Sequence, residues 1–404
     1  MPSWGGGKRG KKAPRESAKS SIDALPDVIL HQILGFLPAR DAVRTCVLSR
    51  RWRDLWMFAT GLRIMGDDGD EMEDLREFVD HVLLARRIVP LETCELRFDG
   101  ISDEFSDGDV LRVNLWFRHA IRSQVRVLRL LLAQNSKYFV LDELHLVSRH
   151  LMELELAGVE VTESFINLSD CPALEQLVVD DCDLSIVKKI LSKSLKRLSI
   201  TSCAFSKSFR AHIHAPSLVS LLLCDNVFYT PVLESMPSLV DASIRIVEKK
   251  VDSCGICDSG NCYKCHRIIH DSSNCILLGG LSNAKNLSLV AESNTFIFKM
   301  DLKHCPTFSK LKTLLLRDYW CVALDLDAIT YFIKNSPLLE KLTLELFSKG
   351  SELGMNLKGN YIPVQETAAI SEHLKIVEVK CDVVNERIYK VLKLMSSFNI
   401  PSEV

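Results

Sequence analysis

The chain has 404 residues, of which 47% are hydrophobic and 25% charged, a composition typical of a folded protein with two or three domains or one long repeat array. Its net charge of −2 gives no general reason to expect a nucleic-acid partner. No run approaches the roughly 18 apolar residues of a membrane span, so we expect no membrane segment. The fourteen cysteines, without a secretion signal, favour a reducing compartment. We therefore expect the nucleus, the cytoplasm or both.

Residues 1–20 form a basic segment that we expect to be a disordered tail. It carries Lys8, Arg9, Lys11, Lys12, Arg15 and Lys19 against the single acid Glu16. The tail therefore holds about +5 charges and the remainder about −7. A solvated tail is the prediction, and a nuclear-import signal in "KRGKK" is the alternative.

Residues 21–60 predict a compact unit of three short helices. The first, in "DALPDVILHQILGFLPARD", is apolar on nearly every side, unlike a surface helix with one apolar stripe. Pro26 fits its first turn and Pro38 ends it. A second helix is expected over 40–46 and a third over "RRWRDLW", capped by Ser49. So small a unit cannot bury that much apolar surface, so we expect a partner to cover part of it.

Residues 61–90 are predicted to be a linker followed by a helix. The acidic stretch "GDDGDEMED" is the linker. Leu75, Phe78, Val79, Val82 and Leu83 then fall on one helical face, and a Pro at position 90 ends the segment. A second amphipathic helix is predicted over 110–122.

From residue 91 to residue 346 an apolar triplet recurs, in which the second and third members follow the first by three and five positions. The triplets are Leu91/Cys94/Leu96, Val125/Leu128/Leu130, Leu151/Leu154/Leu156, Leu174/Leu177/Val179, Leu195/Leu198/Ile200, Leu218/Leu221/Leu223, Leu239/Ala242/Ile244, Ala284/Leu287/Leu289, Leu311/Leu314/Leu316, Leu339/Leu342/Leu344 and, beyond this range, Leu374/Val377/Val379. The period of 21 to 23 residues between 151 and 239 is that of a leucine-rich repeat, which gives one short strand per unit to a curved parallel sheet.

Three positions after three of these strands stand Cys182, Cys203 and Asn226. This repeat type favours Asn or Cys there, because their donors satisfy turn backbone. We therefore predict a structural role for both cysteines.

Two segments interrupt or end the repeats. An insert at 249–276 contains "CGICDSGNCYKCH". Residues 347–404 are expected to form a C-terminal cap of one strand and one amphipathic helix with Ile388, Val391, Leu392 and Leu394, which would cover the open end of the repeats.

The stretch "LPDVILHQILGFLPARDAVRTCVLSRRWRDLW" resembles the F-box family in its two Leu-Pro pairs, its Val-Leu-Ser run and its closing Trp-Arg-x-Leu-Trp. The resemblance implies that the unit docks on a SKP-type adaptor, which joins a cullin–RING ubiquitin ligase, and that the segment after it selects the substrate. The remainder is similar to the plant F-box/leucine-rich-repeat group with a C-terminal FBD segment, through "FVDHVLLARRIVPLETCELRF", "LHLVSRHLMELELAGVEV" and "LKIVEVK".

Carried over by position, the resemblance implies an adaptor-binding surface made of several apolar residues in the F-box. They are Leu25, Pro26, Ile33, Leu37 and Pro38, together with Val47 and Trp52, which are shared between that contact and the unit's own core.

The cysteine insert offers a competing interpretation. Cys254, Cys257, Cys262 and Cys265 form two C-x-x-C pairs that could hold a tetrahedral zinc ion. Their four-residue spacer is shorter than that of the usual zinc ribbon. We therefore predict a cysteine-bearing loop without metal, and keep a zinc-dependent scaffold or nucleic-acid binder as the alternative.

Nothing in the sequence supports catalysis. There is no phosphate-binding glycine loop, nucleophile elbow or metalloprotease motif. His212 and His214 share a strand-like face without an evident third ligand, and His145 and His150 are expected to be solvated. No cofactor is expected.

The predicted fold is therefore α/β, with a short three-helix F-box, an irregular leucine-rich-repeat solenoid and a C-terminal strand-helix cap. The predicted function is substrate recognition in a SKP–cullin–F-box ubiquitin ligase, without catalysis by the chain itself. The alternative is a leucine-rich-repeat scaffold or small-molecule sensor outside ubiquitination. The substrate is expected on the concave sheet face, where Glu153, Glu155, Gln176, Arg197 and Ser199 lie between the repeat leucines.

Overall fold

The computed structural model describes residues 21–66, 72–87, 89–98, 106–132, 138–141, 145–246, 275–291, 301, 306–318, 326–346, 373–382, 384, 388–389 and 391–393. Among these residues, no helix combines the length and the apolar character that crossing a bilayer requires.

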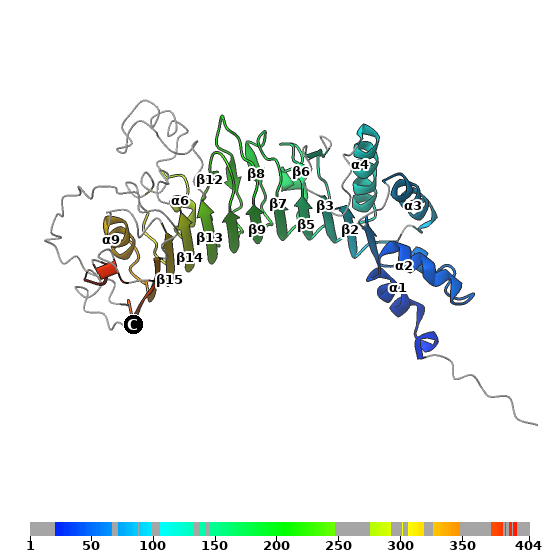
Figure 1. Ribbon diagram of the computed structural model, residues 1–404, viewed down its shortest axis with the longest axis horizontal. Helices are drawn as coiled ribbons and strands as arrows, with labels where there is room; N and C mark the ends of the chain where they lie inside the picture. The colour runs from blue at the N-terminus through cyan, green and yellow to red at the C-terminus, as the bar shows by residue number, and fades with distance from the viewer. Residues whose placement is uncertain are drawn as a thin grey trace, which may run out of the picture.

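The main feature of the molecule is one sheet of twelve strands, each paired in parallel with the next (Figure 1). The strands are β1 (Gly61–Met65), β2 (Thr93–Phe98), β3 (Val127–Leu132), β5 (Glu153–Ala157), β7 (Gln176–Asp180), β9 (Arg197–Thr201), β11 (Ser220–Cys224), β13 (Asp241–Ile246), β14 (Asn286–Ala291), β15 (Thr313–Asp318), β16 (Lys341–Leu346) and β17 (Ile376–Cys381). The molecule has the shape of an arc, and the sheet lies along its concave side. The predicted α/β class and large parallel sheet are confirmed.

The predicted apolar triplets set the register of this sheet. Each central residue pairs with the central residue of the next unit, as Leu177 does with Leu198 and Leu198 with Leu221. These three side chains are at most 2% exposed. They therefore form one continuous row in the core, because every unit places the same position of the strand inward.

The sheet begins one strand earlier than the triplets predicted. β1 lies within residues 61–90, which were expected to hold only a linker and a helix, and its Leu62 pairs with Cys94 of β2. Ala59, Leu62 and Ile64 follow the same spacing and are all buried. The prediction missed this strand because Ala59 lies within residues 21–60, which were assigned to the helical unit.

A recurring turn closes the central strands. Gly158, Asp181, Ser202 and Asp225 have φ values of 71°, 47°, 55° and 55°, in the left-handed region that Gly, Asp and Asn tolerate best. The residue after each of the last three donates a hydrogen bond to the preceding unit. Cys182 donates to the backbone carbonyl of Leu156 at 3.6 Å, Cys203 to that of Val179 at 3.5 Å and Asn226 to that of Ile200 at 3.0 Å. The predicted structural role of these side chains is confirmed.

The two cysteines in this ladder are buried free thiols. A hydrogen bond with Cys182 and burial raise the pKa of the Cys203 thiol. Because only the thiolate is reactive, this supports an inert role.

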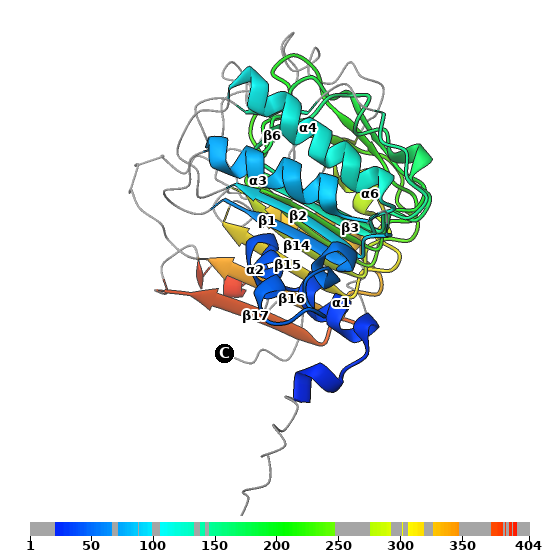
Figure 2. The same ribbon diagram turned by 90° about the vertical axis from the view of Figure 1, so that its right-hand side faces the viewer.

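The outer side of the sheet carries a second layer (Figures 1 and 2). It includes α3 (Met72–Ala85) and α4 (Asp107–Arg122), the three-stranded sheet of β8 (Lys189–Leu191), β10 (His212–His214) and β12 (Val232–Leu233), and the pair of β4 (Phe139–Val140) and β6 (Val159–Glu160). The helix predicted after the linker is confirmed as α3, whose Leu75 and Val79 are fully buried. Ser106 and Asp109 close a capping box at the start of α4, which fixes where that helix begins.

The N-terminal unit contains two of the three predicted helices, α1 (Asp27–Gly35) and α2 (Ala39–Arg44), preceded and followed by 3₁₀ turns η1 (Ser21–Ala24) and η2 (Thr45–Val47). The third predicted helix is wrong. Residues 50–54 form turns, and η3 (Leu55–Phe58) is a 3₁₀ turn. Trp52 and Leu55 are both buried although the segment is not an α-helix.

The N-terminal unit is fixed to the β1 edge of the sheet. A Cβ on Gly61 would lie 2.2 Å from the backbone oxygen of Gly35, so only glycine permits this approach. The buried Arg86 donates to the carbonyl of Ala59 at 2.7 Å, and burial lowers the pKa of this guanidinium. Ala39 of α2 packs in the main core. The unit therefore covers a sheet edge that would otherwise be open.

The predicted insert does not interrupt the sheet. β13 and β14 pair over six positions, from Asp241 with Asn286 to Ile246 with Ala291. Residues 247–274, and with them the four cysteines of the possible zinc site, lie outside the described residues. Where the chain returns from the insert, the backbone N–H groups of residues 276–278 donate to the carboxylate of the buried Asp301 at 2.6 to 2.9 Å.

Two short helices accompany the last strands, α6 (Leu278–Leu281) and α9 (Leu326–Lys334). The strand predicted in the C-terminal cap is confirmed as β17. Of the helix predicted after it, Ile388 and Val391 are buried at 4% and 3% exposure, while Leu394 lies outside the described residues.

Candidate protein-docking surface

The N-terminal unit has a small core of its own. Leu30 and Leu34 of α1, four residues apart and therefore on one helical face, are at most 1% exposed. They belong to a cluster of Leu30, Leu34, Ala42, Trp52, Leu55 and Ala59. Burial in this cluster explains one apolar side of α1.

A second apolar side of α1 faces outward. Val28 is 66%, Ile29 40% and Ile33 37% exposed, and Phe36 directly after the helix is 71% exposed. Ile29, Ile33 and Phe36 are four and three residues apart, so they share a helical face. Because the unit's core is already closed, these side chains have no role in it.

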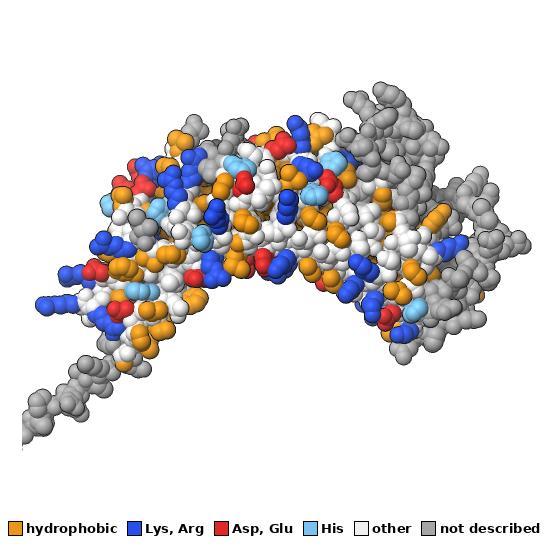
Figure 3. Space-filling model, turned by 180° about the vertical axis from the view of Figure 1, so that it is seen from behind, with side chains coloured by type: hydrophobic (Ala, Val, Ile, Leu, Met, Phe, Trp, Pro, Cys, Tyr) orange, Lys and Arg blue, Asp and Glu red, His pale blue; other side chains and the backbone are white. Residues whose placement is uncertain are grey.

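The segment after α2 adds to the exposed apolar surface. Val47 at the end of η2 is 83% and Leu48 64% exposed. Figure 3 shows hydrophobic side chains gathered at the end of the molecule that carries this unit. We call Val28, Ile29, Ile33, Phe36, Val47 and Leu48 the exposed apolar face.

Arg51 holds the entry of α1 against the turns that follow α2. Its guanidinium donates to the carbonyl of Leu25 at 2.5 Å and to the carboxylate of Asp27 at 2.6 Å. Asp27 lies in the first turn of α1, where the helix dipole favours a negative charge. The pairing positions α1 and therefore its exposed residues.

The structure divides the predicted adaptor-binding residues by location. Pro26, Ile33 and Val47 are exposed, Leu25, Leu37 and Pro38 are half-buried, and Trp52 is only 4% exposed in the unit's core. Leu25 and Leu37 pack against that core. Trp52 is therefore placed to support the surface from inside.

Four exposed residues were missing from the predicted set: Val28, Ile29, Phe36 and Leu48. Sequence reasoning saw that the first helix is apolar all round, but it could not divide inward from outward residues. That division depends on where Trp52 and Leu55 reach α1. Both belong to the segment predicted wrongly as a helix.

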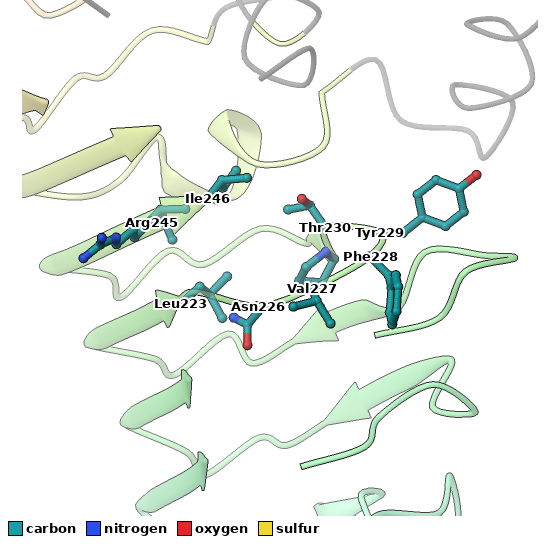
Figure 4. A pocket seen from close by; sticks show the side chains of 10 residues that line it. Leu223, Asn226, Val227, Phe228, Tyr229, Thr230, Arg245 and Ile246 are labelled. Atoms are coloured by element: carbon teal, nitrogen blue, oxygen red, sulfur yellow. The ribbon is translucent and has the colours of Figure 1, made fainter. Parts of the chain in front are cut away.

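The cavity shown in Figure 4 is not a small-molecule site. It lies between the turn after β11 and the end of β13 and has a volume of about 20 Å³, room for about one water molecule. Its cation, Arg245, is paired with Asp225 at 3.1 Å. The cavity is therefore too small to hold a small-molecule ligand.

Three of the four histidines named from the sequence pair with a carboxylate side chain. The imidazole of His214 lies 2.6 Å and that of His212 3.6 Å from Glu234, which also pairs with Lys189 at 3.2 Å. His145 pairs with Asp170 at 2.6 Å. Within the described residues, no group of three or more His, Cys, Asp or Glu side chains is arranged to hold a metal ion.

Residues 22–57, which include the whole exposed apolar face, match the family model of the F-box domain. The chain therefore carries an F-box domain. Its relatives extend the similarity well beyond that domain.

Meiotic F-box protein MOF of Oryza sativa subsp. japonica is 29% identical over 360 residues, which cover 80% of this chain and 70% of the relative. An F-box/FBD/LRR-repeat protein of Arabidopsis thaliana is 28% identical over 372 residues, covering 83% and 78%. F-box/LRR-repeat protein 13 of Arabidopsis thaliana is 26% identical over 369 residues, covering 83% and 78%. The predicted resemblance to plant F-box/leucine-rich-repeat proteins is confirmed.

Proposed function

We propose that this chain is the substrate-recognition subunit of a SKP–cullin–F-box ubiquitin ligase. The observation that carries the proposal is the exposed apolar face on a domain whose own core is closed. A face of this kind marks a protein-binding site, and the F-box match makes a SKP-type adaptor the partner that fits it.

In this proposal the curved sheet is a leucine-rich-repeat solenoid whose concave side takes the protein substrate. The uniform register of the triplets and the repeated left-handed turn support it, since solenoids stack equivalent units and use the extended concave surface for binding. Of the residues expected there, Arg197 is exposed, while Glu153, Glu155, Gln176 and Ser199 are half-buried.

The proposed contribution to ubiquitination is positioning and not chemistry. A substrate bound on the sheet would be held beside a ubiquitin-loaded partner, which raises its effective concentration there. The fixed junction at Gly35 and Gly61 supports this role, because a rigid joint keeps that distance constant. The chain would act in the nucleus, the cytoplasm or both.

The proposal is tested by titrating the full-length chain with a purified SKP-type adaptor. Leu25→Ala with Pro26→Ala should weaken binding by about 1–4 kcal/mol, as for central interface residues. The double variant should also fail to enter a complex with the cullin–RING partner during size-exclusion chromatography. Undiminished binding by a folded double variant would contradict the proposal.

A further inference from the structure

The charges on the concave face of the sheet are not evenly distributed along its length. Four positions of each unit carry these charges: the residue before the strand's first position, and the first, third and fifth residues of the aligned register. From β1 to β13 these positions hold equal numbers of cations and carboxylates. They are Arg63, Arg97, Arg126, Arg129, Lys196, Arg197 and Arg245 against Glu92, Glu95, Glu153, Glu155, Glu175, Asp180 and Asp241.

The last four strands depart from this balance. The same positions of β14 to β17 carry twice as many cations as carboxylates: Lys285, Lys312, Arg317, Lys341, Lys375 and Lys380 against Glu340, Glu345 and Glu378. We call these positions of β14 to β17 the C-terminal basic strip. Figure 3 shows Lys and Arg side chains gathered along the hollowed side of the molecule at this end.

Each carboxylate in the strip is already shared between two cations. Glu340 lies 2.9 Å from Lys312 and 3.5 Å from Lys375. Glu378 lies 3.0 Å from Lys341 and 3.7 Å from Lys380.

Glu345, only 10% exposed, lies 2.6 Å from Arg317 and 3.4 Å from Lys380. Lys285 is exposed and has no ion pair with a described residue. The side chain of Lys375 is 70% exposed. The internal pairs therefore leave an excess of positive charge open to solvent.

We propose that the C-terminal basic strip binds an acidic segment of the protein substrate. This deepens the proposed function and rests on it, because it takes the inner sheet face as the substrate surface. The chain beyond the basic tail carries about −7 charges in total, so a local positive excess would orient an acidic segment toward these strands.

The composition of the strip favours a peptide over a nucleic acid. Its uncharged positions hold apolar, hydroxyl and amide side chains, including the half-buried Thr313 and Leu315 and the 48% exposed Ile376. None of the strip's positions holds an aromatic residue, whereas binding of single-stranded nucleic acid relies on aromatic stacking. Apolar side chains of a peptide would find contacts here.

The test uses the full-length chain and a fluorescein-labelled peptide of alternating glutamate and glycine, with a glutamine-glycine peptide of equal length as the neutral probe. Fluorescence anisotropy should show binding of the acidic probe that weakens with salt. Lys285→Glu, Lys312→Glu and Lys375→Glu together should weaken it by at least about tenfold. If the Glu variant fails to fold, a milder triple variant with Gln at these positions replaces it. That variant should lose part of the affinity for the acidic probe.

The matched control changes Arg126, Lys196 and Arg197 to Glu in the balanced half of the sheet. It makes the same overall charge change but lies outside the strip, so it should bind the acidic probe within about twofold of wild type. Carbodiimide cross-linking of the probe to lysines, mapped by mass spectrometry, should label Lys285, Lys312 or Lys375.

Equal losses in both charge variants, cross-links confined to residues 1–20, or tighter strip-dependent binding of oligothymidylate would overturn the inference. Adaptor titration separates this result from the proposed function. The strip variants should bind the adaptor as wild type does, so a wild-type chain that fails to bind it refutes the proposed function, whereas unaltered probe binding by the strip variants refutes only the acidic substrate.

Discussion

Arg197 and Leu198 are neighbours in β9, yet Arg197 is exposed and Leu198 only 2% exposed. Strand side chains alternate between the two faces of a sheet, so a shift of one residue would exchange their environments. The register pairs Leu198 with Leu177 and Leu221. Substitution of Leu198 should therefore destabilise the fold, whereas substitution of Arg197 should not.

Leu198→Ala should lower the free energy of unfolding by about 2–5 kcal/mol, because it opens a cavity in the continuous row of leucines. Arg197→Ala should change it by less than about 0.5 kcal/mol, as for other surface substitutions. Urea denaturation of the full-length chain measures both. Similar losses for the two variants would show that the strand is placed wrongly by one residue.

At the scale of the element, a strand can remain in register although a long segment separates it from its neighbour. β13 and β14 pair at six positions across the cysteine-containing insert, and Asp301 accepts three backbone N–H groups where the chain returns from it. The pairing and this anchor give the return of the chain a structural basis that does not involve the four cysteines of the possible zinc site.

Replacement of Cys254, Cys257, Cys262 and Cys265 by Ser should therefore leave the melting temperature within a few degrees. Loss of a structural zinc would remove on the order of 10 kcal/mol of binding free energy from the folded state. Asp301→Ala is the positive control, since it leaves buried donors unpaired at about 1–3 kcal/mol each. One zinc per chain by elemental analysis, or a collapse of stability in the Ser variant, would favour the metal site instead.

The elements that sequence predicted well are those in which one local pattern decides the structure. The triplet around Leu198 has period-two alternation and a 21- to 23-residue repeat, so it fixed both strand and register. The third F-box helix was predicted wrongly because the spacing of Trp52 and Leu55 fits a 3₁₀ turn as well as an α-helix. The exposed set around Ile29 and Phe36 was incomplete for the same reason, since the packing of that turn decides which side of α1 remains outside.

At the scale of the whole molecule, the F-box and the sheet meet through a glycine pair. A Cβ on Gly61 would lie 2.2 Å from the oxygen of Gly35, whereas the nearest atom to a Cβ on Gly108, in α4, lies at 3.7 Å. The first contact is backbone against backbone, so neither side can yield by moving a side chain. The joint therefore fixes how the docking surface sits relative to the sheet.

Gly61→Ala should lower the free energy of unfolding by about 1–3 kcal/mol, as overpacking does. Gly108→Ala should be neutral or slightly stabilising, because alanine is the better helix residue. Thermal denaturation compares the two, and hydrogen exchange should show faster exchange across residues 27–65 in the Gly61 variant alone. Equal behaviour of the two variants would mean that the F-box is not held against β1 as the structure has it.

Docking of the exposed apolar face on a SKP-type adaptor is the proposed step on which the function depends. The most direct measurement is the dissociation constant of the full-length chain for the purified adaptor in two paired-Asp variants. Ile33→Asp with Val47→Asp changes the exposed apolar face. Leu111→Asp with Leu115→Asp changes two residues of α4 that are 60% and 59% exposed. We expect a loss of at least about a hundredfold for the first pair and wild-type binding for the second. Equal affinity of both variants and wild type would contradict it.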